Sequence, residues 1–164
     1  MGKSICFTGH RKIGGAYVSS LVNNRVYPAI SAAIARAAAR GFGRFISGGA
    51  LGVDQIAAQA VVDLGLELAI ARPFPSQSCK WPQQSRAVLD RLCAAAASVI
   101  DVSPDPYSPR KMQVRNQWMV DQADVVIAVF DGQPGGTANC VTYAREQRKR
   151  VLVIDPASLL ERWI

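Results

Sequence analysis

Residues 123–137, "ADVVIAVFDGQPGGT", join an apolar run to a glycine-rich turn and decide the fold class. The run Val125–Phe130 has no charged residue and is rich in β-branched side chains, which is typical of a strand buried within a parallel sheet. Pro134 and two glycines end the strand, and a helical pattern follows through Ala144. This order predicts one strand–turn–helix unit of an α/β fold.

Strand and helix patterns of this kind alternate over the whole chain. Six strands are expected, at residues 4–9, 44–49, 66–74, 97–103, 123–130 and, as the final strand, 150–155. Between them apolar side chains recur at helical spacing, as in the helix expected from Pro109 to Gln122. The alternation predicts an α/β Rossmann-like three-layer domain with a mainly parallel central sheet and helices on both faces. Right-handed crossovers would place the first and fifth strands side by side at its centre.

The composition is that of a globular chain, with 49% hydrophobic and 19% charged residues. A length of 164 residues suits one core, so we expect residues 1–164 to form a single domain. No apolar run reaches the roughly 18 residues that span a bilayer. The N-terminus also lacks the apolar stretch of a secretory signal. We therefore expect a cytoplasmic protein without a membrane partner.

The cysteine content and the net charge limit which metals, cofactors and ligands we expect the chain to bind. Four scattered cysteines without a C-x-x-C pair, and a single histidine, argue against a metal site, and we expect neither metal nor cofactor. Reduced, mostly buried thiols fit a cytoplasmic protein. The net charge of +7 fits a soluble basic surface, a phosphate-bearing ligand or nucleic acid.

Three unusual loops follow predicted strands and should meet at one edge of the sheet. They are "FTGHRKIGG" (7–15), "SGGALGVD" (47–54) and "FDGQPGGTANC" (130–140). Glycine lets backbone amides approach a ligand, and a helix that starts there favours negative charge. The expected ligand-binding residues are Thr8, Gly9, His10, Arg11, Gly48, Gly49, Gly52, Asp54, Asn116, Gly132, Gly135, Gly136 and Thr137.

Simpler structural roles compete with ligand binding at several of these positions. Thr137 could merely cap the helix that follows the glycine pair. Asp54 could stabilise the positive end of its own helix or bind a ribose hydroxyl. Phe74 and Trp81, which flank a proline-rich connection, could stack on a base or pack the long loop against the sheet.

Several motifs together resemble the SLOG superfamily, the relatives of DprA/Smf and Lonely Guy proteins. They are "FTGHR" (7–11), "SGGALGVDQIAAQAV" (47–61), "PFPSQSCKW" (73–81), "MQVRNQWMVDQADVVIAVFDG" (112–132) and "PGGT" (134–137). The order and the residues of these motifs are closest to those of the YpsA-like branch. The resemblance extends from Phe7 to Asp155. The resemblance implies a Rossmann-like fold and a pocket for nucleotides or nucleotide-derived, ADP-ribose-like molecules. It also implies dimers, which are frequent among these relatives.

The resemblance leaves open whether the chain is an enzyme. In Lonely Guy phosphoribohydrolases a similar M-x-x-R pattern supplies a catalytic arginine. The resemblance therefore implies that Arg115 could be catalytic; the alternative is that Arg115 forms a surface salt bridge. Those enzymes also carry a glutamate soon after the glycine pair, where this chain has no carboxylate. Asp131, or else Asp54, could take its place.

Three functions therefore remain. The first is binding or sensing of a nucleotide-like small molecule. The second is hydrolysis of the N-glycosidic bond of a nucleotide, with Arg115 and Asp131 as catalytic residues. The third is DprA-like binding of single-stranded nucleic acid, which the positive charge allows.

Overall fold

A seven-stranded sheet forms the middle of the computed structural model, which describes residues 2–164. The strands are β1 Lys3–Gly9, β2 Phe42–Ser47, β3 Glu67–Arg72, β4 Ser98–Asp101, β5 Val125–Val129, β6 Arg150–Ile154 and β7 Glu161–Trp163. Their order across the sheet is β4-β3-β2-β1-β5-β6-β7. Every neighbouring pair is parallel except β6 and β7. The predicted mainly parallel sheet is thus confirmed.

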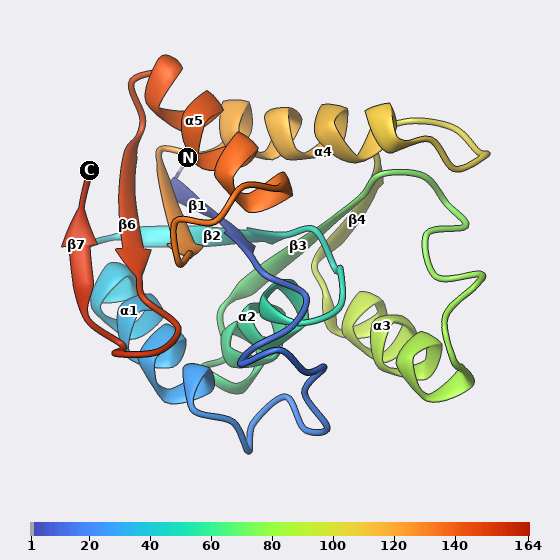
Figure 1. Ribbon diagram of the computed structural model, residues 1–164, viewed down its shortest axis with the longest axis horizontal. Helices are drawn as coiled ribbons and strands as arrows, with labels where there is room; N and C mark the ends of the chain where they lie inside the picture. The colour runs from blue at the N-terminus through green and yellow to red at the C-terminus, as the bar shows by residue number, and fades with distance from the viewer. Residues whose placement is uncertain (1) are drawn as a thin grey trace.

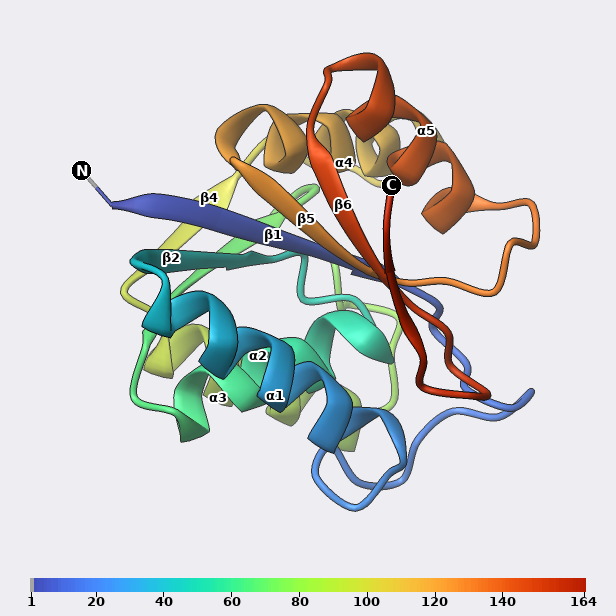
Figure 2. The same ribbon diagram turned by 90° about the vertical axis from the view of Figure 1, so that its left-hand side faces the viewer.

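Five helices cover the two faces of this sheet (Figures 1 and 2). They are α1 Val26–Ala39, α2 Val53–Asp63, α3 Gln83–Ala95, α4 Pro109–Gln122 and α5 Gly136–Glu146. The first three lie on one face, and α4 and α5 lie together on the other. The Rossmann-like three-layer prediction is confirmed.

The centre of the sheet is the pair β1 and β5, aligned from Ile5 opposite Val125 to Gly9 opposite Val129. Successive side chains of β1 point to opposite faces. Ile5 and Phe7 pack with α1, α2 and α3, whereas Cys6 packs with α4 and α5. The winding reverses between these two strands, so the loops that follow them open a crevice at the carboxyl edge.

The strand predicted at residues 150–155 is confirmed as β6, but it is not the final strand, because β7, which was not predicted, follows it. Strand β7 is short, all three of its residues are exposed, and it pairs antiparallel with the edge of β6. Such a strand has neither the apolar run nor the alternation that identifies a buried strand. Backbone bonds between Val151 and Ile164 hold it against β6, together with the Arg36–Glu161 ion pair and the Arg150 guanidinium over the Trp163 ring.

Two further properties concern the chain as a whole. No helix among residues 2–164 is long and apolar enough to cross a membrane. All four cysteines are free thiols. Cys6 and Cys140 are buried, but Cys79 is exposed.

Candidate functional site

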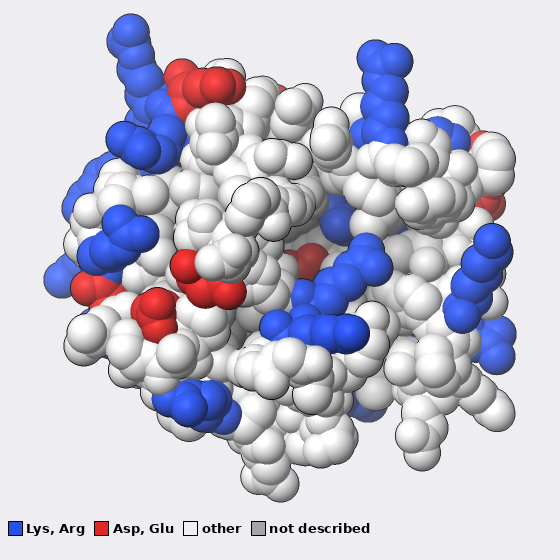
Figure 3. Space-filling view, viewed as in Figure 1, with Lys and Arg blue, Asp and Glu red and all other residues white. Residues whose placement is uncertain are grey.

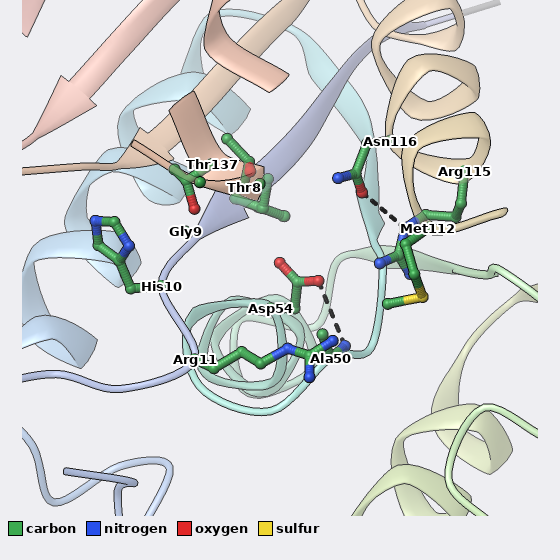
Figure 4. Close-up of a pocket in the computed structure, with 13 residues that line it drawn as sticks. Thr8, Gly9, His10, Arg11, Ala50, Asp54, Met112, Arg115, Asn116 and Thr137 are labelled. Atoms are coloured by element: carbon green, nitrogen blue, oxygen red, sulfur yellow. Dashed lines mark hydrogen bonds between the residues drawn. The ribbon is translucent and has the colours of Figure 1, made fainter. Parts of the chain in front are cut away.

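A cavity of about 290 Å³ opens at the carboxyl end of β1 (Figure 4). It is enclosed by the loop after β1, the start of α2, one face of α4 and the start of α5. Its lining residues are Phe7, Thr8, Gly9, His10, Arg11, Ala50, Asp54, Met112, Arg115, Asn116, Gly135, Gly136 and Thr137. Figure 3 shows a hollow on this face, with basic side chains beside it and an acidic side chain inside it.

The start of α5 presents free backbone amides to the cavity. Gly135 is the N-cap, with φ 144° and ψ −166°, and no side chain caps the helix. A Cβ atom on Gly135 or Gly136 would meet nothing within 4 Å, so the space above these residues is open. Thr137 lies inside the helix and is not its cap. An open helix N-terminus of this kind is a favourable place for an anion.

Unlike the glycines at the start of α5, Gly9 at the end of β1 and the glycines of the loop after β2 are closely packed against other parts of the chain. A Cβ atom on Gly9 would lie 2.4 Å from a methyl group of Val53. On Gly48 it would lie 2.6 Å from Nη1 of Arg115, and Gly49 and Gly52 have positive φ angles. Gly48, Gly49 and Gly52 do not line the cavity. These residues let the β1 loop, α2 and Arg115 approach one another closely.

Arg115 lies over the carboxyl ends of β2 and β3. Its Nη1 donates to the carbonyl oxygens of Gly48 (2.6 Å) and Ala71 (3.1 Å), and its Nε donates to Oδ1 of Asn116 (2.9 Å). The side chain is only 3% exposed, and burial lowers the pKa of its guanidinium. Its Nη2 donates no hydrogen bond to an acceptor among residues 2–164, and Arg115 lines the cavity.

Asp54 is the carboxylate of this cavity. It is 8% exposed and points into the space between Thr137, Arg11 and Arg115 (Figure 4). Its Oδ2 accepts the Ala50 N–H at 3.4 Å, and no basic group forms an ion pair with it within 4 Å among the described residues. Burial raises the pKa of the Asp54 carboxyl, a shift that the nearby Arg115 guanidinium opposes. The carboxyl, which accepts only the Ala50 N–H among residues 2–164, has room to accept a further hydrogen bond from a group in the cavity.

His10 and Asp131 form a pair at the rim. Nε2 of His10 lies 3.0 Å from Oδ1 of Asp131, which is 43% exposed and also accepts the Gln133 N–H. Neither Asp131 nor Gly132 lines the cavity. The pair ties the loop after β1 to the loop after β5. Of the two acidic residues considered from the sequence, Asp54 therefore lies in the cavity and Asp131 lies outside it.

A second pocket, of about 280 Å³, adjoins the first. Arg11 and Met112 line both pockets. Phe74 lines the second pocket, is buried, and packs edge-to-face on the exposed Tyr107, with ring centroids 5.8 Å apart. Trp81 lines the same pocket and is half-buried. The pocket therefore offers aromatic and thioether surfaces to a flat apolar group.

Some lining residues were not singled out from the sequence. Met112 begins the M-x-x-R pattern three residues before Arg115, a spacing that places both on one helical face and was the available signal. Gln77 carried no signal: its Nε2 donates to the Gly48 carbonyl, an interaction that only the folded chain reveals. No cluster of three His, Cys, Asp or Glu residues suited to a metal ion occurs in residues 2–164.

Comparison with known proteins identifies a family to which the sequence is similar and solved structures that share the fold. The sequence model described as the YspA SLOG family matches residues 5–157. The uncharacterized SPbeta prophage-derived protein YoqJ of Bacillus subtilis (strain 168) is 36% identical over 119 residues, which cover 63% of this chain and 70% of that protein.

Two solved structures share the architecture. DNA processing protein A from Helicobacter pylori, described for its single-stranded DNA binding mode, superposes with a TM-score of 0.67 at 19% identity. The match covers 93% of this chain and 65% of that one. DNA processing protein A from Streptococcus pneumoniae gives a TM-score of 0.66 at 16% identity, covering 93% and 50%. At these identities the likeness establishes the fold alone.

Proposed function

The chain belongs to the YspA SLOG family, and we propose on that premise that it binds a nucleotide or a nucleotide-derived molecule of the ADP-ribose kind. One observation carries the proposal. A cavity with an open helix N-terminus and two arginines directly adjoins a pocket lined by aromatic side chains. Together the two pockets have the size of a small-molecule site and the two chemistries that a nucleotide requires.

The parts of the ligand divide between the pockets. A phosphate binds at the amides of Gly136 and Thr137 and pairs with Arg11. A ribose hydroxyl donates to the Asp54 carboxylate, which has no basic partner within ion-pair distance among the described residues. The base enters the second pocket beside Trp81, where stacking stabilises any base through its π face.

Thermal unfolding in the presence of a nucleotide panel tests the proposal. A ligand at a hundred times its Kd stabilises the folded chain by about 2.7 kcal/mol, because it binds the folded state alone. We expect at least one nucleoside phosphate to raise Tm, and the matching free nucleoside to raise it far less. If the nucleoside phosphate and the free nucleoside raised Tm equally, phosphate binding at the start of α5 would be contradicted.

Single-stranded nucleic acid is the competing ligand, since the chain carries a net charge of +7. Binding to many phosphates weakens steeply with salt, because each contact releases counterions. A mononucleotide held by a few contacts has a shallow salt dependence. Titrations at two salt concentrations therefore separate the two functions.

Asp54 also favours a second candidate, hydrolysis of the N-glycosidic bond. Water would attack the anomeric carbon, the bond to the base would break, and the base would leave with a proton. A carboxylate beside the sugar stabilises the oxocarbenium-like centre that develops. Asp54 is buried in the cavity, whereas Asp131 lies outside it, which favours Asp54 for this role.

Substitution of this carboxylate tests hydrolysis. If free base is released from a nucleoside monophosphate, we expect Asp54→Asn to slow the release by about a hundredfold or more, since a preorganised charge is lost. Asp131→Asn is the matched control and should retain the rate. Chromatography of the released base gives the measurement. No release by the unaltered protein across the panel, with binding intact, leaves binding as the function.

A further inference from the structure

A third hollow, of about 1130 Å³, continues from the second pocket. It lies between residues 17–22, the start of α2, and α3 with the residues before it. Lys80 and Trp81 line both the second pocket and this hollow, and Arg11 lines all three spaces. A single groove thus runs from the start of α5, past Arg11, to α3.

The charges along the outer part of this groove are all of one sign. Arg11, Lys80 and Arg91 line the third hollow, and no Asp or Glu does so. The second pocket likewise has no acidic lining residue. Apolar surface is supplied by Leu51 and Val88. Positive charge beside aromatic and apolar surface is the combination that phosphate-linked bases require.

One nucleotide does not account for this groove. Its phosphate, ribose and base are satisfied within the first two pockets, which leaves unused the third hollow and Arg91, a cation that lines only this hollow. We propose that the ligand consists of two nucleotide units joined through phosphate, with the second unit in the third hollow. This inference rests on the proposed function and specifies its ligand.

Arg11 lies where the linking phosphate would pass. It is the cation common to all three spaces, and its side chain extends beneath Asp54 toward Ala50 (Figure 4). Trp81 lies between the second pocket and the third hollow and offers its ring to a base. Arg91, on α3, supplies positive charge at the outer end.

A length series measured by calorimetry tests the inference. The probes are AMP, the 5′-phosphorylated diadenylate, diadenosine diphosphate, and a 5′-phosphorylated octaadenylate. We expect at least one two-unit probe to bind about tenfold or more tightly than AMP, because a second base is stacked and a second phosphate is paired. The octaadenylate should gain nothing further beyond the diadenylate.

Two variants on α3 locate the second unit. Arg91→Gln should reduce the advantage of the two-unit probe over AMP about threefold or more. Arg86→Gln removes the same charge from the same helix at an exposed position that lines none of these spaces, and it should preserve that advantage.

The outcomes separate this inference from the proposed function. If AMP binds and neither two-unit probe binds more tightly, the two-unit ligand is overturned and nucleotide binding stands. If the octaadenylate binds much more tightly than the diadenylate, the groove holds a longer strand and the inference is likewise overturned. If no probe binds, AMP included, both the proposed function and the inference fail for adenine nucleotides.

Discussion

Replacing Gly52 by alanine is expected to lower the free energy of unfolding by about 3 kcal/mol or more, because two unfavourable effects coincide there. Gly52 has φ 85° and ψ −128°, a conformation that side chains with a Cβ rarely adopt. An added Cβ would also lie 2.4 Å from the carbonyl oxygen of Arg11 and 2.5 Å from that of His10. These are backbone atoms, and the His10 carbonyl accepts the Val53 N–H, so neither can move freely.

Gly65→Ala is the matched control. Gly65 also has a positive φ, 68°, but an added Cβ would meet nothing within 4 Å. Its substitution should lower the free energy of unfolding by only about 1 to 2 kcal/mol, the penalty of the left-handed conformation alone. Urea unfolding of both variants measures the difference. Equal losses would show that the contact between the loop after β1 and the start of α2 is not tight.

Gly52 also shows what a glycine pattern leaves undecided. Glycines after strands were interpreted as places where a ligand approaches the backbone. In the structure Gly9 faces Val53 and Gly52 faces two carbonyl oxygens, whereas Gly135 and Gly136 face open space. The same residue type serves internal packing in two loops and leaves a third accessible. Sequence identifies the loops but not the neighbour that each glycine faces.

Most of the fold was predictable from the sequence, but strand β7 was missed. Both outcomes have physical reasons. The apolar run of β5 and the alternation of strands with helices depend on local pattern, which sequence displays directly. Strand β7 depends on pairing with β6 after a turn, and its exposed residues carry no pattern. Pairing of a short, exposed strand at the edge of a sheet leaves no apolar periodicity in the sequence.

The cavity was predictable in outline because strand order fixes which loops meet. The choice between Asp54 and Asp131 was not, since position in the chain does not determine where a side chain points. Asp131 follows the central strand but pairs with His10 at the rim. Asp54 lies in the first turn of α2 and points into the cavity (Figure 4). Only the three-dimensional arrangement distinguishes them.

Gly136→Asp should abolish nucleotide binding while the chain remains folded. An Asp side chain at the first position of α5 projects into open space, because a Cβ there meets nothing within 4 Å. Its carboxylate occupies the amides that the phosphate would use and repels the phosphate. The same charge is favourable for the helix, by about 0.3 to 1 kcal/mol. We therefore expect unchanged or slightly higher Tm without ligand, and no rise when nucleotide is added.

Two substitutions at the same position separate charge from volume. Gly136→Asn has nearly the shape of the aspartate without its charge, so it should weaken binding less than Gly136→Asp. Gly136→Ala adds only a methyl group in open space and should bind almost as the unaltered chain does. If calorimetry gives Gly136→Asp the affinity of the unaltered protein, the phosphate does not bind at the start of α5. If all three variants lose binding equally, close approach to the glycine backbone matters more than charge, since even a methyl group would then be too large.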